Sequence, residues 1–297
     1  MKITSVGFLS LRIILFIATC SGISSCAQPS KEKIPSPTGY NLSAPKKFNM
    51  PEVLEEISGI AFHKGNPAIV YAQQDEEGKV FWGNMESKKF QSSKFAKNGD
   101  FEDITTLGDM LILLKSNGDL YSFPIAEVQK KHAAGVTETK GLLPKGEYEG
   151  LFADEKAGLI YVLCKECKTD KNKKSTTGYT LNMDQSGYLK NVGTFQVDVS
   201  GVDKLAGRKK GTFHPSALAK HPFTNEWYMV SAINKALLVA DGNFKVKAAY
   251  HLTADLFNQP EGIAFDKNGN LYISNEGGDV QFGNILKFSY QKPGKKP

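Results

Sequence analysis

Cysteine is scarce in this sequence, with four residues in a chain of 297. Cys164 and Cys167 form one Cys-x-x-Cys pair, and no second pair exists to complete a four-ligand zinc knuckle. No βαβ pattern surrounds the pair, which disfavours a thioredoxin-like redox site. A disulfide would require a turn or bulge, because residues three apart in a regular strand point to opposite faces. The state of these two cysteines stays open.

Signals of a catalytic nucleophile are also missing. No Gly-x-Ser-x-Gly elbow is present, and the histidines are scattered along the chain. They are His63, His132, His214, His221 and His251. His221 precedes a proline in a turn-like pair, which favours a structural role for it. The sequence therefore contains no nucleophile constellation.

The positive charge does not indicate a nucleic-acid partner. The formal charge is +6, and two of the positive residues lie in the first 25 residues. Much of the remaining excess lies in the loop-like stretches 168–174 and 292–297. Solvated loops explain such charge, and no basic motif with interleaved aromatics is present. We expect no nucleic-acid partner.

No apolar run is long enough to cross a bilayer. Lys2 and Arg12 precede a short apolar stretch, residues 13–18, which suits the core of a signal peptide. Residues 23–26, Ile-Ser-Ser-Cys, then resemble the bacterial lipoprotein box, in which the cysteine is lipidated after cleavage. The resemblance makes Cys26 the first mature residue. The alternative is an ordinary secretory signal in which this cysteine is incidental.

These features predict an address in the cell envelope. Residues 1–25 would be the lipoprotein signal peptide, and residues 26–43, rich in Pro, Ser and Lys, would be a flexible tether. Lipid chains anchor a domain to a membrane that it does not span, so we expect a lipid anchor, most simply in the outer membrane. An exported location also permits a disulfide.

Five similar motifs follow the tether. They are ISGIAF at 57–62, FEDITT at 101–106, YEGLFA at 148–153, PSALAK at 215–220 and PEGIAF at 260–265. Their second residues are Ser58, Glu102, Glu149, Ser216 and Glu261, at intervals of 44, 47, 67 and 45 residues. Periods of this length are typical of propellers and solenoids.

The residues after each motif favour a propeller. A turn signal, a β-rich run, a second turn and another β-rich run follow each copy, and helical periodicity is nearly absent. The predicted fold is an all-β, five-bladed β-propeller over residues 44–290, with a basic tail at 291–297. A sixth, degenerate blade in the long third interval is the alternative. Residues 44–50 could complete the last blade, so that both chain ends close the ring.

The repeated motif would form the innermost strand of each blade, along the central channel. Period-two alternation then points Glu147 and Glu149 together into the channel, and it does the same for Glu56 with Ser58 and for Asp100 with Glu102 in their blades. His214 with Ser216 and Gln259 with Glu261 complete the set. Acids from successive blades would therefore meet around one pore.

Oxygen ligands gathered in this way suit a hard cation, and we expect Ca²⁺. The predicted metal ligands are Glu102, Glu149, Glu261 and Asn275. Other residues expected at the channel or its ligand are Ser58, Asp75, Glu76, Lys115, Lys165, Ser216 and Glu276. In the alternative, Lys115 and Lys165 neutralise Glu102 and Glu149 as fixed ion pairs that keep the blades in register.

The ordered series of motifs resembles a known family. EISGIAF, YAQQDEEG, GDFEDIT, YEGLFAD, HPSALAKHP and QPEGIAFDKNGNLYISNEG are similar to the SdiA-regulated family of exported β-propellers, over about residues 48–290. That family is related more loosely to phytase-like and gluconolactonase-type propellers. The lysine-rich insertion and the Cys-x-x-Cys pair depart from its pattern. The resemblance implies a fold and an exported address rather than a reaction.

Two functions remain in competition. The first is a membrane-anchored binding or scaffold module of the envelope, with an unidentified small-molecule or protein ligand and a cation in the channel. The alternative is a calcium-dependent hydrolase of a lactone, ester or phosphoester, with Asp75 or Glu76 as general base. Acids would repel a phosphate, so the second function depends on the metal.

Overall fold

The computed structural model describes residue 1 and residues 34–170, 174–202, 213–278 and 282–294. Residues 34–297 form one compact unit. The predicted signal peptide, Cys26 and the first part of the predicted tether lie outside the described residues, as does the end of the basic tail. Within the described part, no helix has the length and apolar character needed to cross a membrane.

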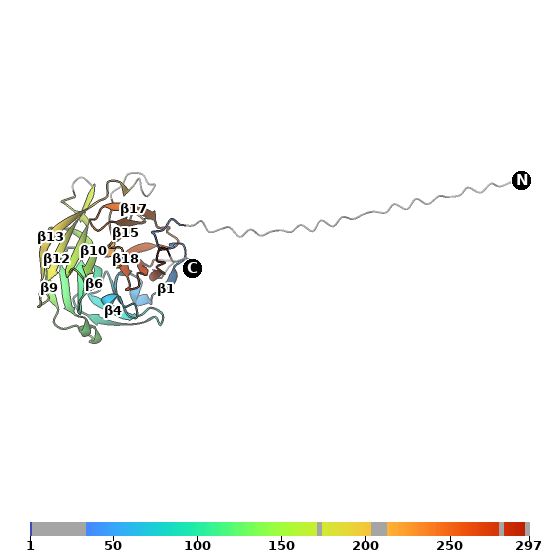
Figure 1. Ribbon diagram of the computed structural model, residues 1–297. Coiled ribbons are helices and arrows are strands. Elements are labelled where there is room, and N and C mark those ends of the chain that lie inside the picture. The colour runs from blue at the N-terminus through green and yellow to red at the C-terminus, as the bar shows by residue number, and fades with distance from the viewer. Residues whose placement is uncertain (2–33, 171–173, 203–212, 279–281, 295–297) are drawn as a thin grey trace. The chain divides into compact units, whose positions relative to one another are not determined.

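The domain consists of five antiparallel four-stranded sheets (Figure 1). The first blade, from the channel outward, contains β2 (Ile57–Ala61), β3 (Val70–Gln74), β4 (Lys79–Asn84) and β5 (Lys89–Lys94). The second contains β6 (Phe101–Leu107), β7 (Met110–Lys115), β8 (Leu120–Pro124) and β9 (Thr137–Thr139). The third contains β10 (Gly146–Asp154), β11 (Leu159–Cys167), β12 (Ser175–Met183) and β13 (Leu189–Asp198). The fourth contains β14 (Ala217–Lys220), β15 (Trp227–Ser231), β16 (Ala236–Ala240) and β17 (Val246–His251). The fifth contains β18 (Gln259–Phe265), β19 (Leu271–Glu276), β20 (Asn284–Phe288) and β1 (Lys46–Asn49).

Three short 3₁₀ helices complete the described secondary structure: η1 (Glu52–Leu54), η2 (His63–Gly65) and η3 (Ile125–Gln129). The strands form where the sequence alternates or concentrates apolar residues between turn residues. In β7, for example, four consecutive residues from Leu111 to Leu114 are buried. A strand covered on both faces by neighbouring blades needs such a continuous apolar run.

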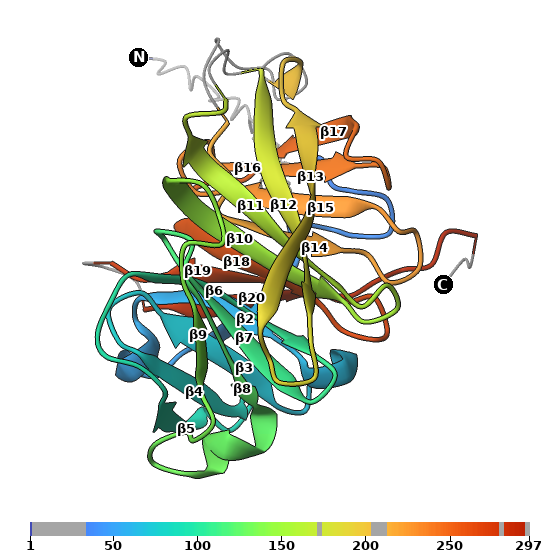
Figure 2. The same ribbon diagram turned by 90° about the vertical axis from the view of Figure 1, so that its left-hand side faces the viewer.

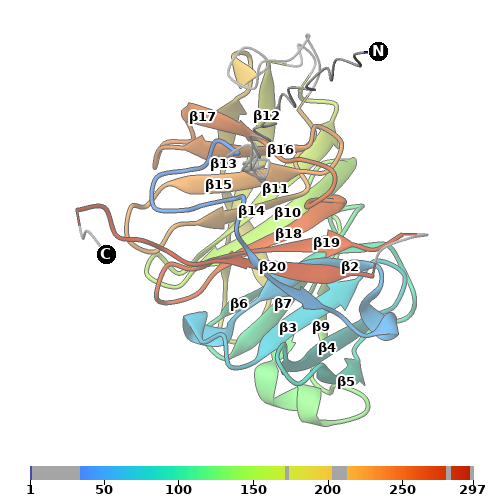
Figure 3. The same cartoon turned by 90° about the vertical axis from the view of Figure 1, so that its right-hand side faces the viewer.

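The chain ends close the ring, as predicted. β1 pairs antiparallel with β20 (Figure 3). In this pairing Phe48 lies opposite Ile285. The innermost strands β2, β6, β10, β14 and β18 contact one another in turn, and β18 contacts β2 (Figure 2). There are thus five blades, and the described residues contain no sheet for a sixth. The long third interval is explained in part by the third blade, whose strands have nine or ten residues.

The apolar core lies between neighbouring blades. Between the third and fourth blades, the ring of Trp227 meets Phe152 and Tyr161 edge-on, at centroid distances of 5.5 and 4.7 Å, and stacks on Phe244 at 4.6 Å. Trp227 is 1% exposed. Aromatic packing of this kind fills the wedge that opens as blades diverge from the channel.

The predicted tether is folded over its described part. Leu42 is fully buried, and Tyr40 packs in the same cluster with Tyr228 of the fourth blade. The hydroxyl of Tyr40 donates a hydrogen bond of 2.6 Å to the carbonyl oxygen of Gly269. Residues 34–43 therefore differ from the expected flexible linker, because two apolar side chains in a Pro- and Ser-rich stretch find a buried site.

Candidate functional site

Each innermost strand that carries a channel glutamate is interrupted by a β-bulge at that residue. The register of β6 against β7 skips Glu102, and the registers of β10 and β18 skip Glu149 and Glu261 in the same way. The register of β2 is shifted around Ser58. A bulge adds a residue to one strand and redirects its side chain. The three glutamates thus leave the ladder at equivalent places in three blades.

The glycine that follows the acid or serine in three of the motifs allows the blades to approach. A Cβ atom on Gly262 would lie 2.5 Å from the carbonyl oxygen of Ser58 in the next blade. A Cβ atom on Gly150 would lie 2.8 Å from Leu218 in the blade after it. Larger residues would push the innermost strands apart and widen the channel.

The bulges alter the predicted alternation. Glu149 is 7% exposed, whereas Glu147 is exposed, so the two acids do not share one environment. The same difference separates exposed Asp100 from half-buried Glu102. Regular period-two geometry would place both members of each pair on one face. The prediction that Glu147 and Glu149 share one face and one environment is therefore wrong. Two register shifts separate the two residues, and Glu147 is exposed whereas Glu149 is buried.

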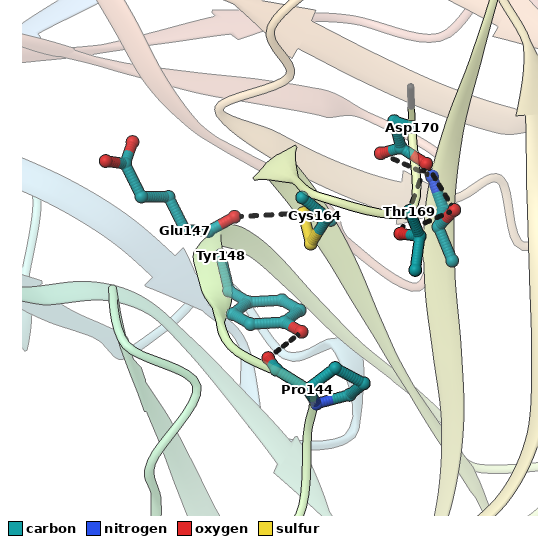
Figure 4. Close-up of a disulfide and its surroundings, with 8 residues drawn as sticks. Pro144, Glu147, Tyr148, Cys164, Thr169 and Asp170 are labelled. Atoms are coloured by element: carbon teal, nitrogen blue, oxygen red, sulfur yellow. Dashed lines mark hydrogen bonds between the residues drawn. A yellow bond between two sulfur atoms is a disulfide. The ribbon is translucent and has the colours of Figure 1, made fainter. Parts of the chain in front are cut away.

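A disulfide frames the lysine of this site. Cys164 and Cys167 are joined, with Cα atoms 6.0 Å apart, and the register of β11 against β10 skips Lys165 between them. This bulge is the distortion that a disulfide at this spacing requires. The Sγ atom of Cys164 lies 3.2 Å from the carbonyl oxygen of Glu147 (Figure 4). The ammonium of Lys165 donates a hydrogen bond to the carboxylate of Glu149, so one of the two expected ion pairs is present.

The three glutamates act on one another electrostatically. Burial raises the pKa of Glu102 to about 9, and the carboxylates of Glu149 and Glu261 add to the rise. Burial raises the pKa of Glu149 to about 7, against the opposing effect of Lys165. Burial also raises the pKa of Glu261. A hydrogen bond with the hydroxyl of Ser216 lowers the pKa of both Glu149 and Glu261, which places these three side chains together. The site thus joins four blades.

A second group of charges adjoins the first. Burial raises the pKa of Glu276 to about 7, and the carboxylates of Glu261 and Asp75 contribute. Gln259 donates a hydrogen bond of 2.6 Å to Glu276. Burial raises the pKa of Asp75 as well, and burial lowers the pKa of Lys235, an effect that Glu261 opposes. Acidic groups therefore outnumber the lysines at this mouth of the channel.

Other predicted channel residues lie at the edge of the site. The hydroxyl of Ser58 donates a 2.7 Å hydrogen bond to the main-chain oxygen of Glu102, which joins the first blade to the second. The ammonium of Lys115 lies 5.5 Å from the ring centroid of Phe101. Among the described residues it makes no ion pair with Glu102 within 4.0 Å, so this expected pair is absent. Glu76 is exposed.

The side chain of Asn275, a predicted metal ligand, forms a hydrogen bond within its own blade. It is fully buried, and its side-chain nitrogen donates a 3.1 Å hydrogen bond to Asn284 of β20, the third strand of the blade. The structure thus directs this amide group outward along the sheet.

Sequence reasoning missed Asp103, which links the second and third blades. Its carboxylate is 3% exposed and accepts hydrogen bonds from the backbone N–H groups of Ile104, at 2.8 Å, and Leu151, at 2.7 Å. Burial raises its pKa well above the ordinary range, while these hydrogen bonds oppose the rise. The signal was a second acid directly after the channel glutamate, in a strand whose remaining residues are apolar or threonine.

Comparison with known protein families places this chain in one of them. The model of the SdiA-regulated family matches residues 36–279. The chain belongs to the SdiA-regulated family. The match spans all five innermost strands, and with them the three channel glutamates. No curated protein matches the sequence.

Solved structures resemble this SdiA-regulated propeller at low identity. Glutaminyl cyclase from Myxococcus xanthus is 15% identical, over 83% of this chain and 96% of that one, with a TM-score of 0.52. A luciferin-regenerating enzyme is 9% identical, over 84% and 96%, with a TM-score of 0.51. The calcium-binding protein regucalcin from Agrobacterium tumefaciens is 10% identical, over 86% and 95%, with a TM-score of 0.49. At such identities the first two show the fold alone.

The geometry also bears on the predicted metal. Carboxylate and hydroxyl oxygens suit Ca²⁺, which takes six to eight oxygens at about 2.3–2.6 Å. In the described part of this SdiA-regulated protein, three possible ligand atoms from His, Cys, Asp or Glu lie within 4.8 Å of one another only at Cys164, Cys167 and Asp170. Two of these are joined in the disulfide. The channel glutamates are thus chemically suited to a hard cation but are not set as a closed metal cage.

Proposed function

We propose that this protein is a lipid-anchored binding module of the cell envelope whose acidic channel mouth recognises a cationic group. One observation carries the proposal. Glu102, Glu149 and Glu261 come from three blades and meet with Ser216 of a fourth, and Lys165 forms an ion pair with Glu149. Like charges gathered in a confined space retain protons, pair with cations or bind a metal.

The protonation states of the channel glutamates support a cationic ligand. At neutral pH Glu102, with a pKa of about 9, holds its proton, and Glu149, with a pKa of about 7, is divided between two forms. A bound positive charge favours the ionised carboxylates and displaces these protons. Binding should therefore strengthen as the pH rises from 6 to 9.

The ion pair that Lys165 forms within the site indicates the class of cation. Lys165 already places an ammonium against Glu149 and acts on Glu102 and Glu261. The carboxylates therefore already accommodate the ammonium of Lys165, which supports a ligand of the same kind, whereas Ca²⁺ would have to draw the carboxylates closer together. We favour an ammonium-bearing small molecule or protein segment over Ca²⁺ as the ligand.

The alternative function, a calcium-dependent hydrolase, has less support. It requires a metal that activates water or polarises a carbonyl. The channel acids form no close-set cage in the described structure. Glu76, one of its two proposed general bases, is exposed. The binding function needs neither feature.

Calorimetry on residues 34–297 tests the binding function with putrescine and Ca²⁺ as separate probes. We expect putrescine to bind, and the double variant Glu149→Gln with Glu261→Gln to weaken it at least tenfold. The exposed Glu147→Gln is the matched control and should bind as the parent does. Failure of both probes, or equal binding by the double variant and the control, would refute a cation site at the channel mouth.

The address has a separate test. Metabolic labelling with a fatty acid should mark the full chain, and Cys26→Ala should abolish the label. Cys20→Ala, at the other cysteine of the N-terminal segment, is the matched control and should keep the label. Fractionation of labelled cells should place the protein in the outer membrane, whereas label that persists in Cys26→Ala would exclude Cys26 as the anchor.

A further inference from the structure

A cavity lies at the end of the innermost strands opposite to the glutamates. The innermost strands carry the glutamates near their starts, and a cavity of about 400 Å³ opens where β2, β6, β10 and β18 end. Its apolar lining includes the aliphatic residue of four motifs, together with two aromatic rings: Ile60, Ile104, Leu151, Ile263, Phe152 and Phe265. An apolar cavity stays dry when no polar group holds water in it. The lining therefore suits an apolar ligand.

Lysines surround this cavity. Lys64, Lys156, Lys220 and Lys267 all belong to its lining, and each lies in or next to the loop that follows an innermost strand. Lys220 pairs with Asp154 at 2.9 Å. Within the described chain, Lys156 and Lys267 make no ion pair within 4.0 Å. Two exposed ammonium groups thus remain available at the mouth.

The other acids of the lining are already engaged. The carboxylate of Glu155 accepts hydrogen bonds of 2.9 and 3.0 Å from the backbone N–H of Gly108. Asp266 is 1% exposed and accepts hydrogen bonds from its own turn and from the hydroxyl of Tyr272. These hydrogen bonds come from neutral groups, so neither carboxylate is held in an ion pair with a lysine, and the lining as a whole has four lysines against three acids.

A buried histidine adds a hydrogen-bond donor. Nδ1 of His221 accepts hydrogen bonds of 3.1 Å from the backbone N–H groups of Phe223 and Thr224, so in the neutral ring the proton is on Nε2. His221 lines the cavity and is 1% exposed, and its Nε2 has no partner in the described structure. A buried donor without a partner is unfavourable, and a ligand oxygen would satisfy it.

We propose that this cavity binds an acyl chain that ends in an anionic head group. The apolar walls take the chain, and the lysines and His221 take the head group. An engineered apolar cavity of about 150 Å³ holds one benzene, so about 400 Å³ corresponds to a chain on the order of ten carbon atoms. Phe223, next to the lining, is 55% exposed and offers a further apolar contact at the mouth.

Calorimetry on residues 34–297 tests the proposal with decanoate and decyltrimethylammonium, which have the same tail and opposite charge. We expect decanoate to bind at least tenfold more tightly. Lys156→Glu with Lys267→Glu should remove this preference, whereas Lys94→Glu with Lys97→Glu, near the other end of the blades, should keep it. Equal affinity for the two probes, absence of binding, or equal loss in both double variants would overturn the proposal.

Two further measurements refine the assignment. His221→Asn keeps a side-chain acceptor for the turn and removes the Nε2 donor, so it should weaken decanoate at least threefold. Unchanged decanoate binding in a folded His221→Asn would overturn the role of His221. Co-sedimentation with phosphatidylglycerol vesicles, but not phosphatidylcholine vesicles, would identify a membrane lipid as the source of the chain. Binding of decanoate without vesicle binding would identify a free acid.

Discussion

Replacing Glu102 with glutamine should stabilise the protein at alkaline pH. The carboxyl is half-buried beside Glu149 and Glu261, and its pKa in the folded state is raised to about 9 from 4.5. Because the folded pKa lies above the unfolded one, the contribution of this group to stability is fully present below pH 4.5. It is lost as the pH rises toward 9. Glutamine has nearly the same shape and never ionises.

The size of the effect follows from the pKa difference. One pKa unit corresponds to about 1.4 kcal/mol. Between pH 4.5 and pH 8 the native state keeps a proton that the unfolded state has released, over 3.5 pH units, which amounts to about 5 kcal/mol for Glu102. Glu102→Gln should therefore match the parent near pH 4 and exceed its free energy of unfolding by up to about 5 kcal/mol at pH 8.

Urea unfolding of residues 34–297 at pH 4.5, 6, 7 and 8 measures this directly, with tryptophan fluorescence as the signal. The parent should lose stability with rising pH, and Glu102→Gln should lose about 1.4 kcal/mol less for each pH unit. Glu147→Gln removes an exposed glutamate and is the matched control. A parallel pH dependence in parent and Glu102→Gln would refute a shared, proton-holding cluster at the channel.

Three further predictions concern the support of the site. Lys165→Met should lower the free energy of unfolding at pH 7 by about 1–3 kcal/mol, since it leaves a buried carboxylate without its partner, and adding Glu149→Gln should recover more than half of the loss in the same urea assay. Cys164→Ser with Cys167→Ser opens a very short loop and should cost about 2 kcal/mol, and a reduced parent sample should show the same loss. Phe48→Ala, in the strand that closes the ring, should cost about 3–5 kcal/mol by calorimetric unfolding, whereas a loss below about 1 kcal/mol would mean that β1 contributes little to closure.

The fold was predictable because repetition is visible in the residues themselves. The motifs around Ser58, Glu102 and Glu261 recur near the period of a blade, and each precedes the same order of turns and β-rich runs. Ring closure followed from the missing outer strand of the last copy, which β1 supplies. The fold of residues 34–43 was not predictable, since burial of Tyr40 and Leu42 depends on a surface that the distant fourth and fifth blades form together.

The residues of the site were predictable from the sequence, but the directions of their side chains were not. Period-two reasoning assumes a regular strand, and the bulges at Glu102, Glu149 and Glu261 break that assumption at the residues of interest. Lys165 reaches Glu149 because the disulfide sits across such a bulge, whereas Lys115 lies over an aromatic ring. The alternation of residues in a single strand does not indicate where the lysine side chains lie, because their positions depend on the neighbouring strands and blades.

The acid cluster is the central claim, and proton release on ligand binding tests it most directly. Calorimetric titration of putrescine at pH 7 in buffers of different ionisation enthalpy gives the number of protons released per ligand bound. Glu102 and Glu149, with pKa values of about 9 and 7, predict the release of about one proton or more, and less in Glu102→Gln. Binding that releases no proton, or the same number from parent and Glu102→Gln, would contradict the account.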